Sequence, residues 1–258
     1  MIKRLHCGRA AQAGVQAAAL AQRGFTGISN VLEAPYGGFL SAMGREYKIG
    51  RLLEGLGTDW EAGKVGYKMY PNVTSIHAAL DGFKHLQQKH RLQANDIQRI
   101  DVGCGHMTYV HTAWPYEPAG VTAAQMNLFY GLSVMALRGS VSADDYVQER
   151  IADPDVLAFS KRIHPYEDDA IESRGVAYRH AAILRVHTGA GVLEHEEWSR
   201  RGSPECPVDP QEVREKFFAN AAHAMTRAHA QRVADEVAQL DKLPSLDGLL
   251  SLLKETTQ

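Results

Sequence analysis

The chain has 258 residues, of which 45% are hydrophobic and 22% are charged, and its formal net charge at pH 7 is −2. A chain of this length can bury a substantial core without staples, and its composition is neither disordered nor collagen-like. The small net charge provides no basic field for nucleic acid or an anionic membrane, and no apolar run approaches the ~20 residues that a membrane span needs. We therefore expect neither nucleic acid nor membrane among its partners.

Cysteine usage and the first residues bear on the cellular compartment. Cys7, Cys104 and Cys206 are odd in number and lie far apart in the sequence. Such usage is typical of a reducing compartment rather than of a disulfide framework. The sequence also enters a helical pattern almost at once, without the apolar stretch of a secretory leader. These features predict a cytoplasmic protein.

The first part of the chain is predicted to be helical. Residues 10–23 are rich in alanine, the strongest helix former, and Gly24 can end that helix. The small side chains favour close packing against another helix. A short helical pattern over residues 31–43 is interrupted by a loop at residues 35–38.

An α+β unit is predicted in the middle of the chain. A helix is expected to begin at Thr74 or Ser75, because both can cap a helix and apolar side chains follow at helical spacing. The other predicted elements are a strand over residues 97–102, helices over about 122–138, over 142–151 and from Pro154, and a β-hairpin over 177–198.

Helices return at the C-terminal end. Asp209 and Pro210 open a long helix, and residues 230–253 are helical with a break at Pro244. Helices at both ends of an α+β middle predict an α+β protein. In it, a helical domain is interrupted by, or packed on, an α+β insert.

Several common chemistries have no candidate residues. The glycine-rich turn that starts at Gly103 has Thr108 where a dinucleotide fingerprint needs its third glycine. Metal-ligand spacings are absent, and His223 and His229 are six residues apart, which does not align two ligands on one helix face. There is no G-x-S-x-G nucleophile motif either. We therefore predict neither a metal site nor covalent catalysis.

One segment, residues 66–77, carries a subtler signal. Lys68 lies in an extended stretch just before a helix N-terminus, whose N–H groups attract carboxylates, and His77 lies about one turn into that helix. The residues alone are also compatible with an exposed lysine and a half-buried helical histidine. Both interpretations remain open on the pattern.

Four sequence motifs follow one another along the chain. They are KRLHCGRAA at residues 3–11, GFTG…VLE…GF at residues 24–39, KMYP…H at residues 68–77, and RGSP…P…KF at residues 201–217. Together they resemble the MmgE/PrpD family of 2-methylcitrate dehydratases and cis-aconitate decarboxylases. The resemblance runs over nearly the whole chain.

The resemblance implies a fold and a chemistry. The fold would be a helical domain built from residues 1–64 and 203–258, here partial, with a smaller α+β lid over residues 65–202, commonly in a homodimer. The chemistry would be that of a cofactor-independent hydro-lyase acting on a di- or tricarboxylic acid, as in the 2-methylcitrate dehydratases of propionate catabolism.

The resemblance also implies site residues. Lys3 and Lys68 fall on the family's active-site lysines, Tyr109 falls on its active-site tyrosine, and His77 falls on the histidine that closes the third motif. Lysines suit substrate carboxylates and stabilise the negative charge that develops when a neighbouring proton is removed. Tyr109 could bind the leaving hydroxyl or donate a proton.

Two departures from the family limit this assignment. Val73 stands where the decarboxylases carry a further histidine, and the chain corresponds to the C-terminal half of the family, without the half that supplies catalytic histidines and an aspartate. One hypothesis is a substrate-anchoring half that a separate N-terminal-half polypeptide completes. The alternatives are a truncated or split non-catalytic member, and an isomerase or epimerase of the same family.

Overall fold

The computed structural model describes the backbone of residues 2–44 and 46–254, with side chains from Leu5 onward. The described chain divides into two compact units, one ending at Lys64 and the other beginning at Val65. Whether residues 203–258 share a helical domain with residues 1–64, and whether residues 65–202 act as a lid, stay predictions.

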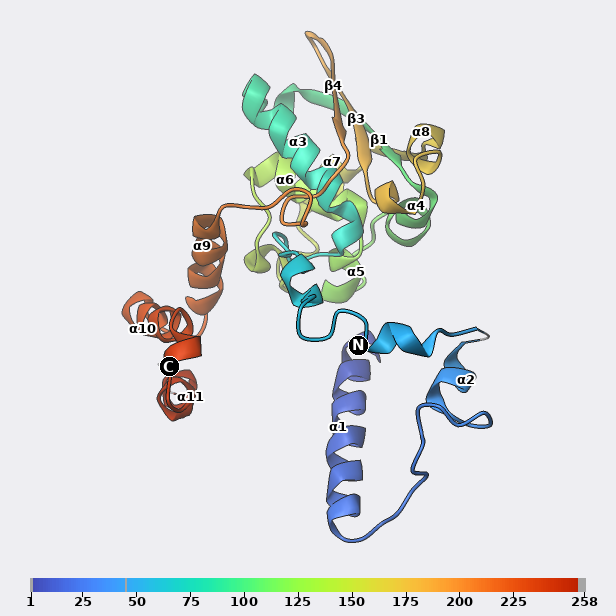
Figure 1. The fold of residues 1–258 in the computed structure, drawn as a ribbon. Coiled ribbons are helices and arrows are strands. Elements are labelled where there is room, and N and C mark those ends of the chain that lie inside the picture. Colours follow the sequence, from blue (N-terminus) through green and yellow to red (C-terminus); the bar gives the residue numbers. More distant parts are fainter. Residues whose placement is uncertain (1, 45, 255–258) are drawn as a thin grey trace. The chain divides into compact units, whose positions relative to one another are not determined.

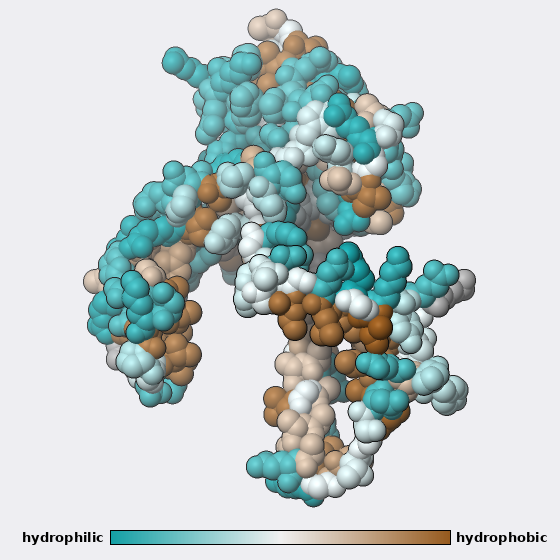
Figure 2. Space-filling view, in the orientation of Figure 1, coloured by the Kyte–Doolittle hydropathy of each residue, from teal (hydrophilic) through white to brown (hydrophobic). Residues whose placement is uncertain are grey.

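The unit that ends at Lys64 is helical but has almost no core of its own. Its elements are helix α1 (Ile2–Gln22), helix α2 (Phe39–Met43) and 3₁₀ turns at Ile49–Leu52 and Glu61–Lys64. From Leu5 to Lys64, only Ala34 and Gly38 are buried among the described residues. Apolar surface therefore extends over α1 and the segments that follow it (Figure 2). The helix predicted over residues 10–23 is confirmed and begins earlier than expected.

A four-stranded mixed sheet is the centre of the second unit. It consists of β1 (Ile97–Cys104), β2 (Ile163–Glu167), β3 (Ala182–Thr188) and β4 (Gly191–Glu197), in the order β2-β1-β3-β4. β1 is parallel to β2 and antiparallel to β3, and β3 and β4 form an antiparallel hairpin. The α+β class and the hairpin are thus confirmed, whereas β2 was not predicted.

Helices pack on this sheet and on one another. α3 (His77–His90) contacts β3 and β4 (Figure 1), α6 (Leu128–Arg138) contacts α3 and α7 (Pro154–Ser160), and α4 (His106–Thr112) contacts β2. The helices of this unit are α3 (His77–His90), α4 (His106–Thr112), α5 (Val121–Gln125), α6 (Leu128–Arg138), α7 (Pro154–Ser160), α8 (Asp169–Glu172), α9 (Pro210–Ala221), α10 (Arg227–Val237) and α11 (Asp247–Lys254). The main core lies between α3, α6 and the sheet, where side chains such as Leu80, Phe83 and Leu184 are fully buried.

Local capping interactions explain two differences from the predicted helices. The helix expected over 122–138 is two helices, because the Asn127 side chain accepts a hydrogen bond from the Tyr130 N–H at 3.0 Å and starts a new helix. The helix expected over 142–151 was wrong. Ser142 and Asp145 cap a short 3₁₀ turn there, and Asp145 is also bound by Arg138. No helix of the described chain is long and apolar enough to cross a membrane.

Candidate functional site

Two of the four motifs, far apart in the sequence, are held together by a close backbone contact. The Tyr67 N–H donates to the Gly202 carbonyl oxygen at 2.6 Å. A Cβ atom at Gly66 would lie 2.4 Å from the Gly202 oxygen, and one at Gly202, whose φ is +85°, would lie 2.4 Å from the Tyr67 oxygen. Only glycines allow this approach, so the stretch that carries Lys68 is fixed against the loop of the RGSP motif.

The close contact at Gly202 predicts that a side chain there destabilises the protein. Gly202→Ala should destabilise the protein by about 2 kcal/mol or more, because it adds a backbone clash to an unfavourable positive φ. Urea unfolding measures the effect. Gly189→Ala is the control, since a Cβ there meets nothing within 4 Å. An equal effect of the two variants would contradict the proposed role of the contact.

Lys68 itself is exposed, and a second lysine holds its backbone. The Lys216 ammonium group on α9 donates to the Lys68 carbonyl oxygen. Burial lowers the pKa of Lys216. Arg200 donates to the neighbouring Tyr67 carbonyl at 3.4 Å. Three cationic side chains therefore belong to one region, although only Lys68 was predicted as a site residue.

His77, the first residue of α3, is fully buried rather than half-buried as one sequence interpretation had it. Its ring packs edge-on against Tyr70, with the ring centroids 5.1 Å apart. Among the described residues, neither ring nitrogen has a hydrogen-bond partner, although the Asn72 backbone lies close enough to favour the protonated form slightly. An unpaired buried imidazole is costly to the fold and therefore calls for an explanation.

The charges of the three cationic side chains affect the pKa of His77. Burial lowers the pKa of His77 to about 3, and the positive charges of Lys68, Arg200 and Lys216 add to that shift. His77 is therefore neutral at physiological pH. An anion placed among these three cations would be attracted by all of them without meeting a charged histidine.

A buried carboxylate ties the same elements together. Asp81 on α3 accepts from the Tyr70 hydroxyl at 2.7 Å and from the Arg201 N–H at 2.9 Å. Burial raises the pKa of Asp81, and these two hydrogen bonds partly oppose the rise. The guanidinium of Arg201 is itself paired with Glu212. Asp81 thus holds the Tyr70 side chain and the Arg201 backbone together.

A second set of polar groups includes residues of α4 and of the 3₁₀ turn Thr74–Ile76 that precedes α3. Ser75 Oγ and His111 Nε2 are 2.8 Å apart, and Thr108 Oγ1 and His180 Nδ1 are 2.9 Å apart. Burial lowers the pKa of His180 to about 4, and Arg179, His111 and Arg200 contribute to the shift. Arg200 therefore acts on both His77 and His180.

The structure brings together only some of the predicted site residues. Lys68 and His77 belong to the same region. Tyr109 lies on α4, half-buried against the main core, two residues from His111. The side chain of Lys3 lies outside the described residues, so its role stays a prediction.

Sequence reasoning missed several residues of this region. Lys216 was present in the fourth motif, and Arg200 directly precedes it, but neither was given a role. Asp81, His111 and His180 carry no local signal, because only the fold brings them together. Within the described chain, no three His, Cys, Asp or Glu side chains form a group that could hold a metal ion.

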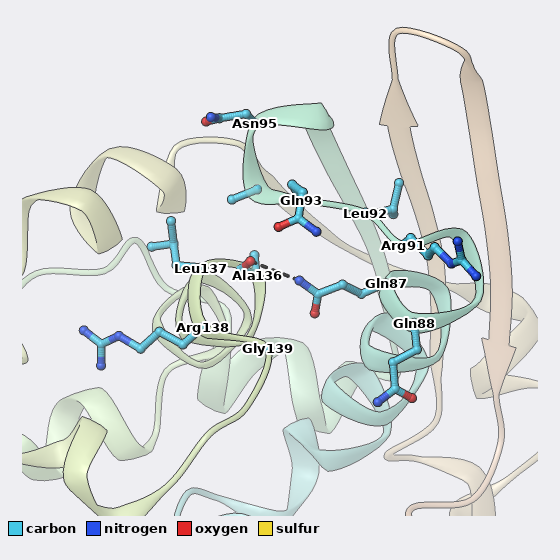
Figure 3. A pocket seen from close by; sticks show the side chains of 11 residues that line it. Gln87, Gln88, Arg91, Leu92, Gln93, Asn95, Ala136, Leu137, Arg138 and Gly139 are labelled. Atoms are coloured by element: carbon cyan, nitrogen blue, oxygen red, sulfur yellow. Dashed lines mark hydrogen bonds between the residues drawn. The ribbon is translucent and has the colours of Figure 1, made fainter.

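A larger concavity lies elsewhere in this unit. It measures about 830 Å³ and lies at the C-terminal ends of α3 and α6 (Figure 3). Four of its eleven lining residues, Gln87 among them, carry amide side chains, and Arg138 is already paired with Asp145 and Asp153. It contains none of Lys68, His77 and Tyr109, so we do not assign the site to it.

The chain is similar to two domains of one protein family and to several curated proteins. Residues 70–242 match the MmgE/PrpD C-terminal domain, and residues 1–51 match the MmgE/PrpD N-terminal domain. The chain is 25% identical to the cis-aconitate decarboxylase-like protein oryM of Aspergillus oryzae, over 98% of this chain and 55% of that protein. It is 25% identical to a cis-aconitate decarboxylase of Aspergillus terreus, over 98% of this chain and 54% of that protein.

A human relative is similar over the same extent of this chain. The chain is 26% identical to the cis-aconitate decarboxylase of Homo sapiens, over 98% of this chain and 53% of that protein. The chain thus spans about half the length of the curated relatives that it matches. Because the C-terminal domain alone accounts for residues 70–242, well over half of the chain, this protein belongs to the MmgE/PrpD family.

Proposed function

We propose that this chain is the substrate-anchoring half of a cofactor-independent lyase that acts on a di- or tricarboxylic acid. The observation that carries the proposal is the group of three cations, Lys68, Arg200 and Lys216, whose charges all act on the buried, neutral His77. Charge-assisted hydrogen bonds from such a group hold carboxylates strongly when the cleft is shielded from water.

The chemistry follows from where charge develops. In a dehydration, a base removes the proton from the carbon next to a carboxylate, the C–H electron pair forms the double bond, and the C–O bond breaks as hydroxide leaves with a proton. Lys68 would stabilise the negative charge that accumulates on the carboxylate, and Tyr109 would donate the proton to the leaving group. Lys3 would bind a further carboxylate. No residue of this chain is assigned as the base. The N-terminal part of the family would supply that base.

A second candidate reaction is decarboxylation, which the names of the relatives favour. There the C–C bond breaks, CO₂ leaves, and the electron pair that stays on carbon takes a proton. Val73 stands where the decarboxylases carry a histidine, so we place the 2-methylcitrate-type dehydration first. An isomerase or epimerase would use the same proton abstraction, and a non-catalytic member would bind without turnover.

The exposed apolar surface of the first unit bears on the partner. Leu53, Leu56 and Trp60 are all at least 71% exposed. A surface of this kind usually marks a protein interface. We propose that it is covered by helices equivalent to the rest of the relatives' N-terminal domain, or by a second copy of the chain in a homodimer.

Co-expression tests the proposed function. The 258-residue chain is produced alone and together with a polypeptide that carries the part of a relative's N-terminal domain that this chain does not match. We expect a complex that dehydrates 2-methylcitrate, and no turnover by the chain alone. Turnover of cis-aconitate with CO₂ release would establish the second candidate instead. A stable complex that binds citrate but converts neither acid would support the non-catalytic alternative.

A further inference from the structure

A small pocket lies between the Lys68 segment and one face of α9. It measures about 260 Å³ and is lined by Tyr67 to Met69 on one side and by Val213, Lys216, Phe217 and Asn220 on the other. The four α9 residues follow the i, i+3, i+4, i+7 spacing of a single helix face. The volume is just below the roughly 300–1,000 Å³ of typical ligand pockets, so it fits a small acid rather than a nucleotide.

The charged part of the pocket is positive. Lys68 and Lys216 both line it, and none of its described lining residues is acidic. An ammonium group has three N–H donors, and Lys216 directs one of them to the Lys68 carbonyl, which fixes its position. Lys216 is half-buried, and burial lowers its pKa. A carboxylate beside it would offset this desolvation.

Beside Tyr67 and Asn220, the pocket also has an apolar wall. Met69, Val213 and Phe217 are half-buried and offer hydrocarbon surface next to the two ammonium groups. Burying one methyl group of a ligand against such a surface strengthens binding about fourfold. A site that combines two cations with an apolar wall distinguishes an alkylated acid from a plain one.

We propose that this pocket is a specificity subsite for a dicarboxylate unit with a short alkyl substituent. Its carboxylates are bound by Lys68 and Lys216, and its alkyl group packs against Met69, Val213 and Phe217. The acid class, including its alkyl substituent, rests on the proposed function, whereas the role of α9 in selecting that acid is new. Lys216 and Val213 thereby become residues that determine which acid is bound.

Binding of two probe acids to the 258-residue chain tests the subsite without requiring turnover. Isothermal titration compares succinate with 2,2-dimethylsuccinate. We expect the dimethylated acid to bind at least fivefold more tightly. Lys216→Gln should weaken both acids about tenfold, and Val213→Thr, which keeps the volume but replaces a methyl by a hydroxyl, should remove most of the preference while succinate affinity stays within twofold.

Controls keep the outcomes distinct. Lys161→Gln changes an exposed lysine at the end of α7 and should alter neither affinity. If Lys216→Gln fails to fold by circular dichroism, Lys216→Arg should fold and bind succinate within threefold of the wild type. The inference is overturned if the wild type does not prefer the dimethylated acid, or if a folded Lys216→Gln variant binds both acids normally. Intact selective binding without lyase turnover in the co-expressed complex would overturn the proposed function alone.

Discussion

Replacing Lys68 with glutamine is expected to weaken the binding of citrate about 10- to 100-fold, and to reduce turnover in the completed complex by at least that factor. Loss of one charge-assisted hydrogen bond removes about 1.5–3 kcal/mol, which corresponds to this range. The effect should exceed that of other exposed lysines, because the Lys68 backbone is held by Lys216 and by the contact between Tyr67 and Gly202. Its ammonium group is thus presented from a fixed main chain.

Three measurements define this result. Isothermal titration gives citrate affinity for the wild type, for Lys68→Gln and for Lys68→Arg, which keeps the charge and should recover most of the binding. Lys161→Gln serves again as the matched control on an exposed surface. If Lys68→Gln binds citrate as the wild type does, Lys68 does not anchor the substrate. The proposed function would then have to rest on Arg200 and Lys216.

Sequence patterns predicted those parts of the fold in which local and tertiary preferences agree. The alanine-rich run of α1, the hairpin of β3 and β4 and the start of α9 at Asp209-Pro210 are of this kind. The strand β2 was missed because His164 and Pro165 break the apolar alternation of residues 163–167, and only pairing with β1 makes it a strand. Its existence depends on a partner more than 60 residues away in the sequence.

The site was predictable only where a motif carried it. Lys68 and His77 were selected by the resemblance and lie in one region. Burial of His77 was underestimated, because its neighbours Tyr70 and Ile76 are covered by elements from elsewhere in the chain. Asp81 reads as an ordinary exposed helix residue, yet the fold places it between the Tyr70 hydroxyl and the Arg201 backbone. Such residues gain their role from long-range contacts that spacing does not encode.

We also expect the buried His77 to make the folded protein strongly sensitive to acid. The unfolded chain binds a proton at this histidine near pH 6.5, whereas the folded protein does so only near pH 3. Between these values the unfolded state holds more protons, so the stabilising contribution is complete above pH 6.5 and is lost as the pH falls toward 3. Between pH 7 and 4.5, His77 alone should remove about 2–3 kcal/mol from the free energy of unfolding. His180, whose pKa is also lowered, acts in the same direction, whereas Asp81, whose pKa is raised, opposes it.

A His77→Phe variant isolates this contribution, because the ring remains packed on Tyr70 while both unpaired nitrogens are removed. The variant should be more stable than the wild type by about 1 kcal/mol at pH 7, since no unpaired polar atom stays buried. Its advantage should grow by a further 2–3 kcal/mol at pH 4.5. His90→Gln, at the exposed end of the same helix, should follow the wild-type curve in urea unfolding at both pH values. Parallel curves for His77→Phe and the wild type would refute the lowered pKa. A variant that is more stable but inactive in the completed complex would mean that the fold retains this histidine for chemistry, at a cost in stability.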